Sequence, residues 1–213
     1  MLEGRQVLAH SARGARELSQ AGRAAGHAHG TAKGLPTVPD NLLGVAQTHE
    51  LLHRLDAAFL RVGEARGGLL VKFSGGESLS DTELRVELES NRLDVGRLEE
   101  EGRFRFLPND EPLGGRVETL RNLVDLADGD GRNVWATFNW AEPVDRETAL
   151  RQQEDLMELV DERQLVVKTA VLEQVVDGWP SATLRRAQVA HSGVIWLSES
   201  GVVLSRVKPL PPE

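Results

Sequence analysis

The chain has 213 residues, of which 40% are hydrophobic and 27% charged, a composition typical of a folded domain with a sizeable core. No run approaches the roughly 20 apolar residues that span a bilayer, and the first thirty residues lack the apolar segment of a secretory signal. We therefore expect a cytoplasmic protein that makes no membrane contact. Cysteine is absent, which excludes disulfides, thiol catalysis and thiolate metal sites.

Charge divides the chain into a basic beginning and an acidic body. Residues 1–40 carry five Lys or Arg and three Asp or Glu, whereas residues 41–213 carry twenty and thirty. An acidic body repels a phosphate backbone, so we expect no strong nucleic-acid binding there. We interpret the Gly- and Ala-rich residues 1–40 as a flexible or partner-binding extension. Val7, Ala15 and Leu18 form a thin apolar stripe on a helix over 6–25, and its interior glycines mean that it needs a partner surface.

Strand-like and helix-like segments alternate from Asn41 onward. The strand-like segments are 41–46, 69–73 (an apolar run interrupted only by Lys72), 103–107 (where Phe104 and Phe106 alternate with Arg), 134–140 and 164–169. The helical segments are 48–62, 80–101 with a break near Asn91, 113–126, 146–161 and 181–190. The runs 194–197 and 202–207, joined through 198–201, have the pattern of a β-hairpin.

This alternation predicts an α/β domain over residues 41–207, followed by a Pro-rich tail at 208–213. The sheet is expected to be open and mainly parallel, with helices on both faces and a C-terminal β-hairpin.

One string has the spacing of a zinc site. His49, Glu50 and His53 satisfy H-E-x-x-H, in which two imidazoles on one helix face hold zinc and the glutamate acts as base. A third ligand is missing from the residues that follow, since Asp56 and Phe59 replace the longer His-x-x-Gly-x-x-His continuation. We therefore expect no metal, and keep a zinc-dependent hydrolase as an alternative.

The loop after the strand 69–73 lies where open α/β sheets bind ligands. Its residues, Ser74 to Ser78, include Gly75, Gly76 and Glu77 but no lysine, whereas a phosphate-binding loop needs G-x-x-x-x-G-K-[ST]. The strand 134–140 ends in Asn139 and Trp140 without an acidic magnesium ligand. Both halves of a nucleoside-triphosphatase site are therefore missing.

Four blocks of the chain carry a family resemblance. They are FLRVGEARG (59–67) before the strand 69–73, LDVGRLEEEGRFRFL (93–107), QEDLMEL (153–159) before 165–169, and AQVAH (187–191) with GVI (193–195). In order and spacing, residues from about 41 to 197 resemble the MEDS domain (methanogen/methylotroph DcmR sensory domain), a degenerate relative of RecA/KaiC-type ATPases. The resemblance implies a RecA/KaiC-like α/β fold that has lost its P-loop.

The resemblance also implies a non-enzymatic sensory or regulatory role in bacterial signalling or transcription control. We expect no cofactor, and a small-molecule ligand or a protein partner. The expected ligand-binding residues follow the strands: Ser74, Gly75, Gly76, Glu77, Asn109, Asn139, Trp140 and Thr169. A third hypothesis is a self-assembling scaffold, in which the strand 202–207 is an exposed edge that pairs between chains as a homo-oligomer.

Overall fold

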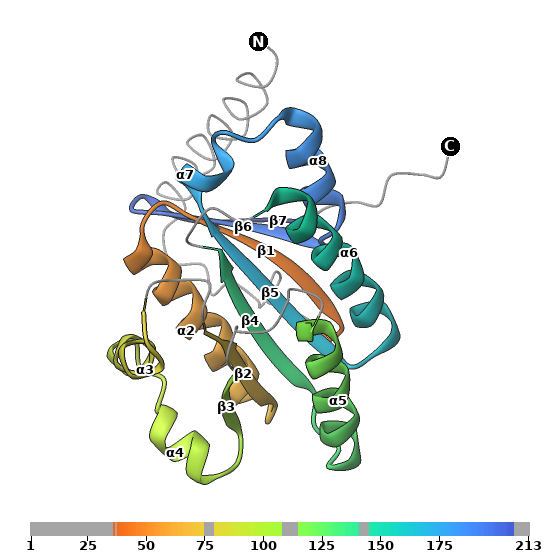
Figure 1. Cartoon of the computed structure of the whole chain (residues 1–213). Coiled ribbons are helices and arrows are strands. Elements are labelled where there is room, and N and C mark those ends of the chain that lie inside the picture. The colour runs from red at the N-terminus through yellow and green to blue at the C-terminus, as the bar shows by residue number, and fades with distance from the viewer. Residues whose placement is uncertain (1–35, 37, 75–78, 108–114, 141–144, 207–213) are drawn as a thin grey trace, which may run out of the picture.

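The computed structural model describes residue 36 and residues 38–74, 79–107, 115–140 and 145–206. Seven strands form one twisted sheet in the order β3-β2-β4-β5-β1-β6-β7 (Figure 1). Six strands are parallel, and β7 runs antiparallel to β6. The strands are β1 (Asp40–Ala46), β2 (Leu69–Phe73), β3 (Phe104–Leu107), β4 (Val134–Trp140), β5 (Leu165–Leu172), β6 (Gly193–Ser198) and β7 (Gly201–Arg206).

Helices cover both faces of this sheet (Figure 1). One face carries α2 (His49–Ala65), α3 (Asp81–Ser90) and α4 (Val95–Glu100). The other carries α5 (Gly115–Gly129), α6 (Arg146–Glu162), α7 (Glu173–Val176) and α8 (Ser181–Val189). The predicted fold class is confirmed, including the closing β6–β7 hairpin. The arrangement is consistent with the RecA-like fold that the resemblance implies.

Local sequence signals explain where the helices begin and end. Thr48 caps α2, because its side chain accepts a hydrogen bond from the backbone N–H of Leu51 at 3.2 Å. Ser80 and Glu83 form a reciprocal capping box at the start of α3. The break predicted near Asn91 is confirmed: α3 ends there, and Arg92 adopts a positive φ of 69° before α4 begins.

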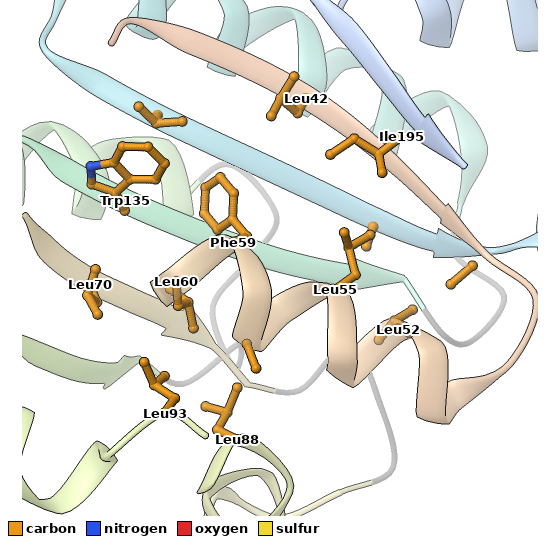
Figure 2. Close-up of a cluster of buried hydrophobic side chains, with 14 of the residues drawn as sticks. Leu42, Leu52, Leu55, Phe59, Leu60, Leu70, Leu88, Leu93, Trp135 and Ile195 are labelled. Carbon is orange, nitrogen blue, oxygen red and sulfur yellow. The ribbon is translucent and has the colours of Figure 1, made fainter. Parts of the chain in front are cut away.

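Large apolar side chains fill the space between α2 and the sheet (Figure 2). Phe59 of α2 packs on Trp135 of β4, with ring centroids 5.3 Å apart. Gly63 allows this close approach, because a Cβ there would lie 2.5 Å from Cγ of Trp135. The helix is therefore held against the centre of the sheet by shape as well as by hydrophobic burial.

Two details differ from the sequence prediction. β5 continues to Leu172, three residues beyond the expected end, because residues after Thr169 still pair with β1 and β4. The short helix α7 follows immediately and was not predicted, since four residues are too few to show a helical period. None of the helices in the described ranges has the length and apolar character needed to cross a membrane.

Candidate functional site

The sheet changes winding direction between β1 and β5, which are neighbours. Alternate side chains of β1 face opposite layers: Leu42 packs with α2, whereas Leu43 packs with α7. The helix after β1 lies on one face and the helices after β5 lie on the other. In open α/β sheets, ligands bind outside the carboxyl ends of the strands at such a switch point.

The switch point lacks the features of a phosphate site. Only Gln47 and Thr48 connect β1 to α2, so no glycine-rich loop cradles an anion there. The first turn of α2 carries Glu50, which pairs with Arg54 at 2.6 Å. A carboxylate at this helix N-terminus occupies the electrostatic position that a bound phosphate would need.

A large groove begins beside this helix N-terminus. It has a volume of about 1130 Å³ and lies between α2 and the β6–β7 hairpin. Its floor contains the cross-strand pairs Ile195–Leu204 and Leu197–Val202. The described helix residues that line it all come from α2: His49, Glu50, Leu51, Arg54, Leu55, Ala58, Phe59 and Val62. Pro36, Thr48, Ser198 and Glu199 complete the lining.

The groove is apolar along its length and polar at one end. In Figure 2, Leu55 and Phe59 extend from α2 toward the sheet, and Ile195 extends from β6 on the same face. The polar residues at the carboxyl end of the strands are His49, Glu50, Arg54, Ser198 and Glu199. Binding sites for small molecules have this character, with mostly apolar walls and a few polar groups that fix orientation.

A buried charge network lies beneath α2, next to the groove. The described part of the chain contains two lysines, Lys72 on β2 and Lys168 on β5, and both are fully buried. Both contact the carboxylate of Asp56 on α2: Lys72 Nζ lies 3.1 Å from Oδ2, and Lys168 Nζ bonds to Oδ1. Thr137 and Asn139 of β4 donate to the same carboxylate, at 2.7 Å and 2.6 Å.

Strand register explains how this network assembles. Lys72 is paired with Thr137, and Thr137 with Lys168, so the three side chains form one row across β2, β4 and β5. Burial alone would raise the pKa of Asp56, but the attraction of Lys168 and Lys72 and the hydrogen bonds hold that pKa well below its ordinary value. A carboxylate so tightly neutralised and so deeply buried is a poor general base. Its contacts instead connect α2 to β2, β4 and β5.

A second polar network lies on the opposite face. Thr169 of β5 donates to Gln153 Oε1 of α6 at 2.8 Å, and His191 Nε2 lies 2.9 Å from the same oxygen. His191 Nδ1 lies 2.5 Å from the carbonyl oxygen of Ala187. Burial lowers the pKa of His191 to about 4, partly opposed by the contact with that carbonyl. The imidazole is therefore neutral at physiological pH, so one of its two ring nitrogens donates a hydrogen bond, and the ring lies between α6 and the end of α8.

Two buried side chains on the α6 face carry polar atoms that the described residues leave without a hydrogen-bond partner. These are the indole Nε1 of Trp140 and both amide atoms of Gln152. Trp140 packs with Ala149 of α6 in one apolar cluster. Unpaired buried groups are costly, and neither residue lines the groove between α2 and the β6–β7 hairpin.

The predicted ligand-binding residues fall on two faces of the sheet. Asn139 contacts Asp56 on the α2 face, whereas Trp140 and Thr169 pack toward α6. Ser74 lies at the end of β2, where its backbone N–H bonds to the carbonyl of Leu107 on β3. Gly75, Gly76, Glu77 and Asn109 lie outside the described residues. The structure thus brings Asn139 into the charge network, and Thr169 into the His191 network.

The two histidines of the zinc hypothesis differ in environment. His49 is exposed at the start of α2, and His53 is buried. The described ranges contain no group of three or more His, Asp or Glu side chains arranged to hold a metal.

Sequence reasoning missed Asp56, Lys72 and Lys168 as a unit, and it missed the groove. A signal for the network was present, because each lysine interrupts an apolar strand and Asp56 lies on the apolar side of its helix. The groove left a weaker signal. Its floor comes from alternate residues of a hairpin, and only the strand order shows that they lie beside α2.

Comparison with known proteins adds no family to this description: no family model and no curated protein matches the chain.

Proposed function

We propose that the chain is a non-enzymatic sensory or regulatory domain of a bacterial signalling or transcription-control system, which acts by binding a small apolar ligand. The observation that carries this proposal is the groove between α2 and the β6–β7 hairpin. Its volume of about 1130 Å³ is ample for a small molecule, and its floor is formed by Ile195, Leu197, Val202 and Leu204. The MEDS resemblance points to the same class of function.

The charges at the polar end of the groove indicate the chemistry of the ligand. Glu50 and Arg54 neutralise one another, which leaves Glu199 as the further charged residue among the described lining residues. A negative end favours a ligand with a neutral or cationic polar group over an anionic one. The proposed ligand is therefore an elongated apolar molecule with an uncharged or basic end.

Signalling would follow from the position of the groove between two structural units. One wall is a helix that starts at the carboxyl end of β1, and the floor is an edge hairpin of the sheet. A ligand that contacts both favours the arrangement in which they fit it best. Ligand binding thus increases the population of this arrangement, and a partner that recognises it binds more of the protein.

Thermal unfolding with decylamine, decanol and decanoate below their micelle concentrations tests the proposal. A ligand at 100 times its dissociation constant adds about 2.7 kcal/mol, which raises the melting temperature of a chain this size by about 5–10 °C. Decylamine and decanol should stabilise more than decanoate. The variant Ala58→Trp, which fills the groove, should abolish the shift, whereas Leu126→Trp on exposed α5 should keep it.

Other results would contradict the proposal in distinct ways. An equal shift in both variants would place the ligand outside the groove. A large loss of stability in chelator, reversed by zinc and abolished by His53→Ala, would favour the zinc hydrolase. No shift with any probe, together with concentration-dependent assembly in light scattering, would favour the scaffold hypothesis.

A further inference from the structure

The groove exposes apolar surface that soluble domains usually cover. Val202 on its floor is 63% exposed, and Leu197 and Leu204 are only partly buried. Contiguous apolar surface of this kind marks a binding surface for a ligand or a polypeptide segment. The groove follows α2 from His49 to Val62, a length of about 20 Å at the rise of an α-helix. It is long enough to hold several turns of a second helix.

The first described residue of the chain, Pro36, lies at this groove. Pro36 is buried and lines the groove, and its carbonyl accepts a hydrogen bond from Arg66, just beyond the C-terminal end of α2. The thirty-five residues that precede it therefore join the domain at the edge of the apolar surface. No long tether is needed for them to reach it.

Those residues have the composition of a helix that requires a partner. Val7, Ala15 and Leu18 form an apolar stripe on the helix predicted over 6–25, and interior glycines make that helix unstable alone. The helix would be about 30 Å long, and the ten residues 26–35 can span a further distance of up to about 35 Å. Length and linker therefore both suffice to lay the helix along the groove.

Charge favours the same pairing. Residues 1–35 carry five basic and two acidic residues, and residues 36–213 carry twenty and thirty-one. The polar end of the groove holds Glu199 beside the Glu50–Arg54 ion pair, so a segment rich in arginine meets a rim with a net negative charge.

We propose that residues 6–25 dock as a helix in the groove between α2 and the β6–β7 hairpin, with Val7, Ala15 and Leu18 against its floor. The segment then acts as an internal competitor, which a ligand of the groove must displace. Only this competition rests on the proposed function, because docking of the segment does not require any small molecule.

Cross-linking between introduced cysteines tests docking in the full chain, which has no cysteine of its own. One variant carries Ala15→Cys and Ala58→Cys, the latter in the groove. The control carries Ala15→Cys and Leu126→Cys, the latter exposed on α5 across the sheet. A short bis-maleimide applied to dilute protein should link the groove pair within one chain at least ten times faster than the control pair. Adding Leu18→Asp should slow the groove link about tenfold, and Gln20→Asp should not.

Each alternative gives its own result. Equal rates in the two pairs, or a rate unaffected by Leu18→Asp, would overturn docking of the segment. Cross-linked dimers from the groove pair at low concentration would instead identify a second copy as the occupant, which also overturns the proposal. If the groove link forms within the chain but decylamine and decanol neither bind nor slow it, docking stands and the proposed ligand binding fails. If decylamine and decanol bind but no groove link forms, the proposed ligand binding stands and docking of the segment fails.

Discussion

Removing the carboxylate of Asp56 should destabilise the chain more than any exposed charge does. Asp56 is fully buried. Its carboxylate forms ion pairs with Lys72 and Lys168 and accepts hydrogen bonds from Thr137 and Asn139. Its replacement by Ala leaves two lysines beneath α2 without this shared carboxylate. Breaking a buried ion pair in this way costs about 3–5 kcal/mol, a large share of the 5–15 kcal/mol that stabilises a typical domain.

Urea denaturation at pH 7 measures this loss, and thermal unfolding should show a fall of about 6–20 °C. The matched control is Asp125→Ala, which removes an exposed carboxylate 3.3 Å from Arg163 and should cost less than about 1 kcal/mol. Replacing Asp56 by Leu and both lysines by Met should recover most of the stability, because the buried charges then disappear together.

The network also makes a pH prediction of definite sign. Since the folded-state pKa of Asp56 lies below its ordinary value, the carboxylate stabilises the folded chain above about pH 4. That stabilisation is lost as the pH falls further, toward the folded-state pKa. Asp56→Ala should therefore differ less from the natural chain at pH 2.5 than at pH 7. Equal losses of stability in Asp56→Ala and Asp125→Ala at pH 7 would contradict the stabilising role of the buried network.

Two further perturbations test the packing. Because burial lowers the pKa of His191 to about 4, stability should fall by up to about 3 kcal/mol as the pH drops from about 6.5 to 4, and His191→Gln should flatten this dependence in urea titrations. An unchanged slope in His191→Gln would show that other groups cause it. Gly63→Ala should cost about 1–3 kcal/mol, because the new Cβ meets the Trp135 ring. Gly96→Ala in α4, which meets nothing within 4 Å, should gain up to about 1 kcal/mol, and a similar loss in both variants would contradict the packing described at Gly63.

The layered fold was predictable because its signals are local. Strands β2 and β4 have the bounds that their apolar runs predict, and α6 begins at the predicted residue, Arg146. These elements are buried on one or both sides, so side-chain hydrophobicity alone marks them. The exposed turn at Glu199 and Ser200 was equally visible, since it separates two apolar runs.

The candidate site was less predictable because it depends on strand order. Lys72 and Lys168 are ninety-six residues apart in sequence, and only the β2-β4-β5 neighbourhood brings both to Asp56. The groove likewise requires β6 to pair with β1, which places Ile195 beside α2. Ligand-binding residues were expected directly after the strands, but Asn139 and Trp140 point to opposite faces of the sheet because side chains alternate along a strand.

An amide NMR titration of the full chain with decylamine tests whether the groove between α2 and the β6–β7 hairpin binds a ligand. If decylamine binds in the groove, chemical-shift changes should concentrate on Leu51, Ala58, Ile195 and Val202 around it. These changes should also saturate at one ligand per chain and vanish in Ala58→Trp. Changes centred instead on Thr169 and Trp140, or none below the micelle concentration, would contradict a ligand-binding groove between α2 and the β6–β7 hairpin.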